Sequence, residues 1–310
     1  MDDRRGFLRR VLLALGGVGL AGVAQRVPGV GRLAGLSGTA EAAQNDLTWV
    51  QGADPYKNTV KALAELGGMG RFVKPGQRVA ILPNIGWARK PEQAGCTHPR
   101  VVRALIDDCE KAGAKSVTLF CNPCNDARVC LDLSGIGAEV EQTKARFEFI
   151  NPKGWVERRA VQGCTHLKST QVYRLVGDSE VLINAAIAKH HGLCELTMCC
   201  KNLMGAIKNR VQMHQYIHES IADLVLMIPS TLCILDATRI LLRNGPSSGD
   251  AGDNLLTNTL IAGVNPAQVD VLGTTLFNKK PQAIGYLRIL AQRSYMVLDP
   301  TKLPHSRARA

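Results

Sequence analysis

The chain has 310 residues, a formal net charge of +12 and an apolar content of 45%, which is ordinary for a globular protein. The positive surplus favours anionic ligands or surfaces over cationic ones. Aromatic residues are few, the basic residues are spread along the chain and no nucleic-acid-binding module is recognisable, so nucleic acid is not an expected partner.

The N-terminus has the layout of an export signal. Basic residues precede an apolar run at residues 11–24, and an A-x-A cleavage site ends at Ala42. The apolar run is shorter than the ~20 residues that a membrane-spanning helix needs. The motif RRGFL at residues 4–8 resembles the twin-arginine signal. We therefore expect residues 1–42 to be a twin-arginine signal peptide, the mature protein to be periplasmic or otherwise exported, and no stable membrane span to remain after cleavage.

Strands and helices alternate from the start of the mature chain. Residues 43–74 read as a lead-in segment with one amphipathic helix, followed by a short buried strand at residues 79–82. A helix with Thr97 as its cap and Pro99 in its first turn comes next, and a strand at residues 116–120 follows it. Strand, helix and strand in about 40 residues make a βαβ unit, which indicates a parallel sheet with right-handed crossovers.

The same alternation continues downstream. Strands are predicted at residues 180–186 and 233–235, and two closing helices open at Pro266 and Pro281. The predicted fold is therefore α/β and Rossmann-like, with a mostly parallel sheet flanked by helices.

The remaining segments are less regular. Residues 138–142 and 146–150 are predicted as edge strands. The main α/β domain is expected to span residues 75–295, and the basic tail at residues 296–310 is expected to fray.

Polar side chains occur where several of the predicted strands end. Asn84 and Asn122 follow the first two strands, Lys189 and His191 follow the third, and Asp236 follows the fourth. In open parallel sheets, ligands bind outside the carboxyl ends of the strands. We therefore expect these side chains to converge on one cleft.

The motifs THPRVVRALIDDCEKAGAKSV, LINAAIAKHHGLCELTMCCKNLMGAI, LCILDATRILLRNGPSSG and NPAQVDVLGTTLF, in this order and spacing, resemble the domain of unknown function 362 family. The resemblance covers residues 75–292 and implies an α/β domain. It carries over the family's polar and glycine positions to Lys189, His191, Lys201, Asn202, Gly205, Asp236, Gly245, Pro246, Gly249 and Asp270. Some relatives carry a ferredoxin-like iron–sulfur segment, but this chain lacks the C-x2-C-x2-C-x3-C run of such segments.

These positions supply the candidate site residues. Lys189, His191, Lys201 and Asp236 are the expected catalytic residues, because they would line the cleft and hold an anionic substrate by charge and hydrogen bonds. The expected cofactor-binding residues are Asn202, Gly205, Gly249 and Asp270.

Ten cysteines give the second lead. Cys121 and Cys124 form a C-x-x-C pair that can chelate a metal from one turn, Cys130 is near enough to add a third ligand, and Cys164 or Cys96 could be the fourth. Four thiolates suit an iron–sulfur cluster, with zinc as the alternative. The twin-arginine route favours a cofactor loaded before export. The rival interpretations are structural disulfides, which an oxidising compartment permits, and buried thiols with neither role.

Three functions follow from these features. The first is redox or electron transfer at a cysteine-ligated centre on Cys121, Cys124, Cys130 and Cys164, with a redox partner. The second is a non-redox enzyme that uses Lys189 and His191 on a small anionic ligand, with disulfide-stapled loops. The third is a non-catalytic binding module.

Overall fold

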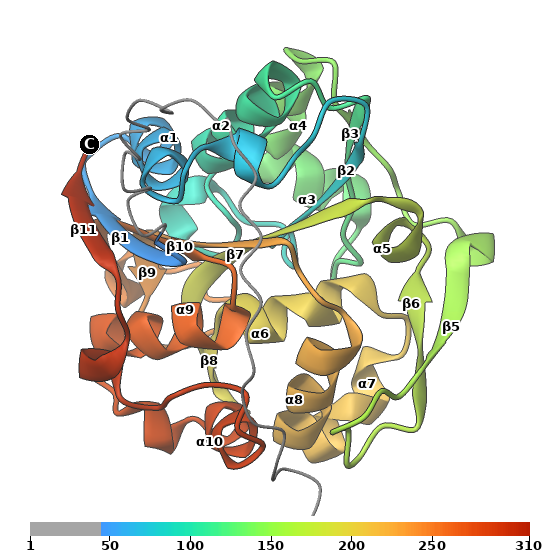
Figure 1. The fold of residues 1–310 in the computed structure, drawn as a ribbon, viewed down its shortest axis with the longest axis vertical. Helices are drawn as coiled ribbons and strands as arrows, with labels where there is room; N and C mark the ends of the chain where they lie inside the picture. The colour runs from blue at the N-terminus through green and yellow to red at the C-terminus, as the bar shows by residue number, and fades with distance from the viewer. Residues whose placement is uncertain (1–44) are drawn as a thin grey trace, which may run out of the picture. The chain divides into compact units, whose positions relative to one another are not determined.

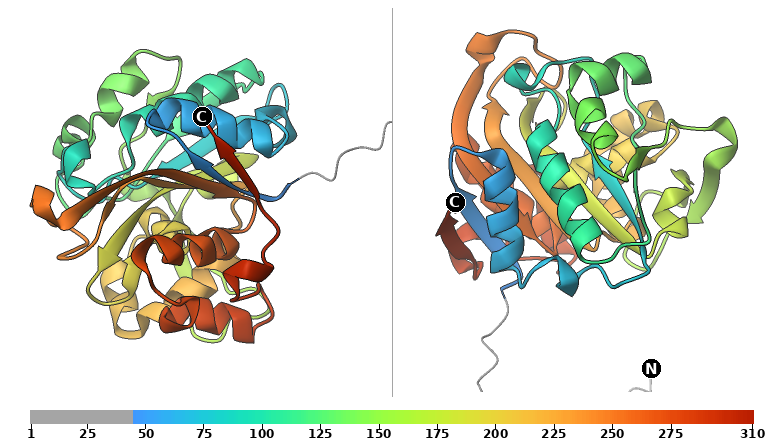
Figure 2. Two further views of the ribbon diagram at one scale, coloured as in Figure 1. Left: turned by 90° about the vertical axis from the view of Figure 1, so that its left-hand side faces the viewer. Right: turned by 90° about the horizontal axis from the view of Figure 1, so that it is seen from above.

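The computed structural model describes residues 45–310, which build a nine-stranded sheet with helices on both faces (Figures 1 and 2). The predicted signal peptide lies outside the described residues. In spatial order the strands are β11 (Ser306–Arg309), β1 (Leu47–Gln51), β10 (Asn254–Gly263), β9 (Leu232–Leu241), β7 (Val181–His191), β2 (Arg78–Pro83), β3 (Ser116–Leu119) and β4 (Arg146–Phe147), and β8 (Glu195–Thr197) pairs with the end of β7. The five strands from β9 to β4 are parallel, so the predicted mostly parallel sheet is confirmed.

The helices divide between the two faces of the sheet, as the left view of Figure 2 shows. One face carries α1 (Pro55–Glu65), α2 (Pro99–Lys111), α3 (Ala127–Leu133) and α4 (Ile136–Glu141). The other carries α6 (Cys199–Asn202), α8 (Ile217–Met227), α9 (Pro266–Thr274) and α10 (Gly285–Gln292). Alternate residues of β2 enter separate cores, with Val79 and Ile81 on the side of α1 and α2, and Ala80 and Leu82 on the other.

Smaller elements complete the chain. A separate two-stranded sheet is formed by β5 (Trp155–Arg159) and β6 (Ser169–Tyr173), and the short helices are α5 (Leu175–Asp178) and α7 (Arg210–Met213). Single 3₁₀ turns occur at Met69–Arg71, Pro91–Gln93, Pro152–Gly154, Leu203–Ala206, His214–Tyr216, Ala251–Asp253, Thr275–Phe277, Pro281–Ala283 and Pro300–Lys302. In the part of the chain described here, no helix has the length and apolar character needed to cross a membrane.

Helix starts follow the sequence signals, with two corrections. Pro281 opens a 3₁₀ turn and not the closing helix, because α10 begins only at Gly285. Pro99 and Pro266 open α2 and α9 as predicted, and Asn265 caps α9 by accepting from two backbone N–H groups. The cap of α2 is His98, not Thr97. The Thr97 hydroxyl instead donates to the carbonyl of Ala185 in β7 over 2.7 Å, so it joins the start of α2 to the sheet.

Two predictions of local structure are wrong. Residues 138–142 do not form a strand, because most of them belong to α4, in which Ile136 and Val140 lie one helical turn apart and are both buried. The tail does not fray at its end, because Ser306–Arg309 adds β11 alongside β1. The predicted edge strand at residues 146–150 is present as β4.

Two strands are longer than predicted, and this changes the setting of the candidate site. β7 runs on through Lys189 to His191 because β8 folds back antiparallel against it, with Lys189 opposite Thr197. β9 continues past Asp236 because β10 pairs along it. Lys189, His191 and Asp236 therefore lie on strands, and not in loops beyond them.

Candidate functional site

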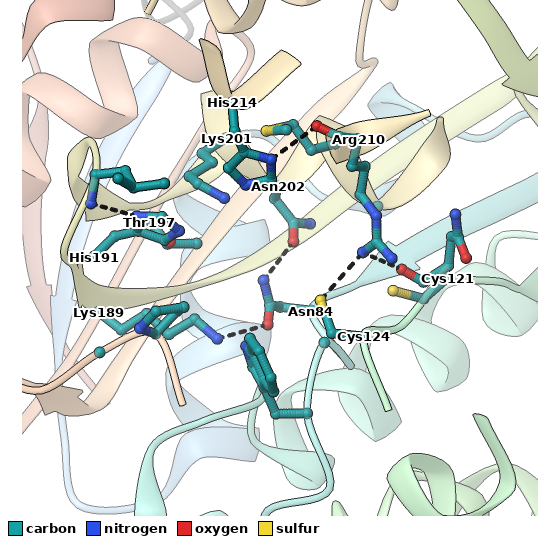
Figure 3. A pocket seen from close by; sticks show the side chains of 18 of the residues that line it. Asn84, Cys121, Cys124, Lys189, His191, Thr197, Lys201, Asn202, Arg210 and His214 are labelled. Atoms are coloured by element: carbon teal, nitrogen blue, oxygen red, sulfur yellow. Dashed lines mark hydrogen bonds between the residues drawn. The ribbon is translucent and has the colours of Figure 1, made fainter. Parts of the chain in front are cut away.

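A cavity of about 520 Å³ opens where β2, β3 and β7 end, beneath α6 and the segment that follows it (Figure 3). Among its lining residues are the cationic side chains of Lys189, Lys201 and Arg210 and the imidazoles of His191 and His214. None of the described residues that line it is an Asp or a Glu. The cavity therefore concentrates positive charge without a carboxylate to balance it, which favours an anionic occupant.

Lys189 is fixed at the floor of the cavity. Its side chain is 2% exposed, and Nζ donates to the carbonyl of Gly95 over 2.6 Å and to Oδ1 of Asn84 over 3.1 Å. Burial lowers the pKa of Lys189 to about 8, and the nearby Lys201 charge contributes to this shift. This lysine is therefore poised to change protonation near neutral pH.

A chain of asparagines runs from Lys189 across the sheet. Asn84 Nδ2 donates to Oδ1 of Asn202 over 2.9 Å, and Asn202 Nδ2 donates to Oδ1 of Asn184 over 2.8 Å. Asn184 then donates to the carbonyl of Cys199 at the start of α6. Because each amide donates to the next, the chain fixes the side-chain orientation of Asn84 and so of the Lys189 amine.

His191 is held in one tautomer. Its Nδ1 accepts a hydrogen bond from the backbone N–H of Leu193 over 3.1 Å, so the ring proton of the neutral imidazole is on Nε2. Burial lowers the pKa of His191 to about 3, and the charges of Lys201 and Lys189 contribute. At neutral pH His191 is thus an uncharged donor through Nε2.

Lys201 points into the cavity from α6, as Figure 3 shows. Among residues 45–310, no side chain or backbone group forms a hydrogen bond or an ion pair with the Lys201 amine. Burial lowers the pKa of Lys201, and the nearby Arg210 guanidinium lowers it further. Close by, the Thr197 hydroxyl is buried in the cavity wall without a hydrogen-bond partner. Lys201 and Thr197, like Nε2 of His191, therefore have hydrogen-bonding capacity left for an occupant.

Arg210 and the C-x-x-C turn form the opposite wall. The guanidinium donates to the carbonyls of Asn122 and Pro123 over 2.6 and 2.7 Å and lies 3.5 Å from Cys124 Sγ. The backbone N–H of Asn122 donates to the carbonyl of Gly205. A Cβ added at Gly205 would lie 3.3 Å from Cys121 Sγ. These contacts explain the predicted importance of Gly205 by close packing of two wall segments.

The glycine-rich loop closes the cavity through its first two residues. Gly245 and Pro246 line the cavity, whereas Gly249 does not. Gly249 instead accepts a hydrogen bond from Gln93 through its carbonyl, and Arg89 holds the loop by donating to Ser247 O over 2.7 Å. The structure thus brings Gly245, but not the predicted Gly249, to the site.

The two predicted acidic site residues also lie outside the cavity. Asp236 accepts from the backbone N–H groups of His98 and Thr238, so it fixes the start of α2 to β9. Asp270 accepts from the N–H groups of Cys199 and Cys200 over 2.7 and 3.0 Å. It therefore caps the short helix that carries Lys201 and Asn202, which is a positioning role.

Asp270 predicts an unusual dependence of stability on pH. Burial raises its pKa to about 7. The unfolded chain ionises this carboxyl near pH 4, while the folded chain keeps it protonated up to about pH 7, so the contribution of Asp270 to the free energy of unfolding falls as pH rises between these values. From pH 5 to 7 this contribution falls by up to about 2–3 kcal/mol. His191, whose pKa is lowered, contributes in the opposite direction, so the expected result is this difference in slope between wild type and Asp270→Asn. Urea unfolding at several pH values measures this slope.

Asp253→Asn is the matched control for that experiment. Asp253 is also buried, but hydrogen bonds from Ser248 and Asn244 lower its pKa. Its titration therefore falls below the pH range tested, and its variant should keep the wild-type slope. Equal slopes in wild type and Asp270→Asn would contradict the assignment.

Of the four predicted metal ligands, Cys164 lies apart, with its Sγ 3.8 Å from the carbonyl of Asp223 in α8. Cys121 and Cys124 line the cavity and Cys130 is buried in α3, and these three, with the alternative ligand Cys96, lie near enough to affect one another's pKa. Within residues 45–310, no three His, Cys, Asp or Glu side chains are grouped so that they could hold a metal ion. This arrangement does not fit a four-thiolate cluster or zinc site. All ten cysteines are free, so no disulfide staples the loops in this structure.

Arg210, His214 and Thr197 are cavity residues that the sequence motifs did not select. Arg210 lies only nine positions beyond Lys201, in the stretch CCKNLMGAIKNRVQMH, so its nearness to the lysine motif was the available signal. Thr197 carries no comparable signal, because its role depends on β8 folding back onto Lys189.

Comparisons with known proteins support the fold and the family. Residues 79–275 match the family described as "Domain of unknown function (DUF362)". The thylakoid-associated protein sll1697 of Synechocystis sp. (strain ATCC 27184 / PCC 6803 / Kazusa) is 27% identical over 251 residues, covering 77% of this chain and 74% of that protein. The lactate racemase apoprotein from Thermoanaerobacterium thermosaccharolyticum aligns with a TM-score of 0.50 and 11% identity, over 74% of this chain. The match spans 56% of the racemase chain, and at this identity it shows a shared fold alone.

Proposed function

Because the chain belongs to the family described as a domain of unknown function (DUF362), we propose its activity from the cavity itself: an enzyme that binds a small organic anion and transfers a proton on it. The observation that carries this proposal is the lining of the cavity. Lys189, Lys201 and Arg210 face a space of about 520 Å³ to which no Asp or Glu contributes. A carboxylate would supply the missing negative charge and accept hydrogen bonds from these donors.

Each polar group has a role that its surroundings permit. Lys201, with its lowered pKa and free amine, is the proton acceptor. Neutral His191 donates from Nε2 to negative charge that develops on the substrate. Lys189, which Gly95 and Asn84 fix at the floor of the cavity, donates a hydrogen bond or a proton to the substrate.

Proton transfer can be followed by hydrogen exchange. Full-length protein in D2O is incubated with small carboxylates, including lactate, the compound in the name of the structurally similar racemase. NMR should show loss of carbon-bound protons next to the carboxylate or carbonyl of at least one compound. Lys201→Met should reduce the exchange at least 100-fold, as expected when a proton-transferring side chain is removed. Lys208→Met removes an exposed lysine nearby and should keep the rate. Equal exchange in both variants would contradict the role of Lys201.

Redox chemistry at a cysteine-ligated centre, and export by the twin-arginine route, stay predictions from the sequence. The proton transfer proposed above needs no cluster, and within residues 45–310 no three His, Cys, Asp or Glu side chains are grouped so that they could hold a metal ion. The direct test is the iron, zinc and sulfide content of the full-length protein purified without oxygen. Stoichiometric iron and sulfide that are lost in both Cys121→Ser and Cys124→Ser would restore the redox hypothesis, whereas zinc would indicate a structural site. Anion binding without any turnover would instead favour the binding module.

A further inference from the structure

We infer that Lys201 is a nucleophile that captures a 2-oxo carboxylate with an apolar substituent as a covalent imine. This inference rests on the proposed anion site and names its substrate class. With a 2-oxo acid, Lys201 acts as the nucleophile and not as the proton acceptor that it is for other carboxylates. The inference follows from three features of the cavity: a free amine, separate cations for a carboxylate, and an apolar rim.

The first feature is the contrast between the two lysines of the cavity. Lys189 Nζ donates to the carbonyl of Gly95 and to Asn84, and these two hydrogen bonds hold it at the floor of the cavity. Lys201 has no such partner among the described residues, and it extends into the cavity. Burial and the neighbouring Arg210 both favour its uncharged form. A desolvated lysine next to another cation is the setting in which an amine becomes nucleophilic near neutral pH.

The second feature is that Lys189 and Arg210 stay available for a carboxylate when Lys201 reacts with a ketone. Lys189 and Arg210 remain to hold a carboxylate beside the reacting carbonyl, since neither is paired with an acidic side chain in the cavity. Thr197, with its unpartnered hydroxyl, and Nε2 of His191 are available to the carbonyl oxygen. A carbonyl next to a carboxylate, which defines a 2-oxo acid, matches this distribution of donors.

The third feature is the apolar rim. Val211 and Leu193 line the mouth and are 84% and 60% exposed, which is unusual for apolar side chains of this size. Trp87, Met204 and Pro246 continue this lining. The cavity is thus polar at its floor and apolar at its mouth, so the substituent of the oxo acid that faces outward should be apolar.

The covalent step is balanced without an oxidant or a cofactor. The Lys201 nitrogen attacks the ketone carbon, a C–N bond forms, and one amine proton passes to the carbonyl oxygen to give a carbinolamine. The C–O bond then breaks as the hydroxyl takes a proton from the Lys189 ammonium and leaves as water. The product is an iminium that keeps the second amine proton, and no atom changes its overall oxidation level.

Reductive trapping tests this inference. Full-length protein is mixed with 4-methyl-2-oxopentanoate or with pyruvate, cyanoborohydride is added, and the intact mass and the peptide map are recorded. We expect one reduced adduct per chain, located on Lys201, with faster labelling for the branched oxo acid than for pyruvate. Labelling should accelerate as Lys201 loses its proton and slow again above about pH 8, where Lys189 loses the proton that dehydration of the carbinolamine requires. His191 stays neutral over this range, and Arg210, Cys124 and Cys194 are the other ionisable groups near Lys201.

Two variants serve as controls for the trapping. Lys201→Arg keeps the charge and should abolish the adduct, whereas Lys208→Arg changes an exposed lysine and should leave it unchanged. The peptide map of wild type needs no variant, so it decides the site even if Lys201→Arg folds poorly. Adducts on Lys189, or scattered over exposed lysines, would overturn the inference. If anions bind but no adduct forms, imine formation at Lys201 is wrong and the proposed anion site stands. If anions do not bind and no adduct forms, both the imine and the anion site are wrong.

Discussion

Replacing Gly245 by alanine is expected to abolish anion binding and to lower the free energy of unfolding by about 3 kcal/mol or more, as severe overpacking does. A Cβ at this position would lie 2.0 Å from the carbonyl oxygen of His190. That oxygen belongs to the backbone of β7, between Lys189 and His191, and it cannot move without displacing both side chains. Either the glycine-rich loop or the end of β7 must therefore leave its place. Urea unfolding and ligand calorimetry measure the two effects.

Gly249→Ala provides the matched control in the same loop. Its Cβ would meet only Gln93 Nε2 at 3.3 Å and Arg89 Nε at 3.7 Å, which are ends of flexible side chains. We expect a cost below about 1 kcal/mol and unchanged anion binding. Equal effects of the two alanines would show that the loop's packing against β7 does not shape the cavity.

Lys189→Met is the second substitution with a large expected effect. It removes a buried ammonium and leaves the carbonyl of Gly95 and Oδ1 of Asn84 without their donor. Each unpaired acceptor costs about 1–3 kcal/mol, which relief of the repulsion between Lys189 and Lys201 offsets only in part. Asn84 also loses the bond that fixes its amide, so the chain to Asn202 is free to reorient.

Anion affinity should fall about 10–100-fold in Lys189→Met, because a charge-assisted hydrogen bond contributes about 1.5–3 kcal/mol. Lys208→Met makes the same change in net charge at an exposed position and should leave affinity within about twofold. Calorimetric titration of both variants with the anion separates the loss of the contact made by Lys189 from the loss of one positive charge on the protein. A similar loss in both would assign the effect to the field of the whole protein and not to the cavity.

The parallel sheet could be predicted because its signals are local. Pro99 and Pro266 mark helix starts, and the apolar run at residues 79–82 marks a central strand buried on both faces. The helix α4 was missed because alternating polar and apolar residues over a short stretch fit a strand as well as a helix. The pairing of Ser306–Arg309 with β1 was missed because it depends on a partner more than 250 positions away.

The candidate site was predictable in part for the same reason. Lys189, His191, Lys201, Asn202 and Gly205 do come together, since the ends of parallel strands meet at one edge. Asp236 and Asp270 carry equally polar side chains, but their backbone partners lie on segments distant in sequence and hold them outside the cavity. Sequence spacing likewise could not show that Cys164 packs against α8 while Cys121 follows β3.

The most direct test of the central claim is calorimetric titration of the full-length protein with 4-methyl-2-oxopentanoate and with the corresponding neutral amide. We expect the carboxylate to bind, the amide to bind at least tenfold more weakly, and Lys189→Met together with Arg210→Met to remove the difference. We also expect rising salt to weaken binding of the carboxylate less than it would weaken binding at an exposed site, because Lys189 is buried and Lys201 is half-buried. Equal affinity for acid and amide, or a preference that survives in the double variant, would contradict an anion site in this cavity.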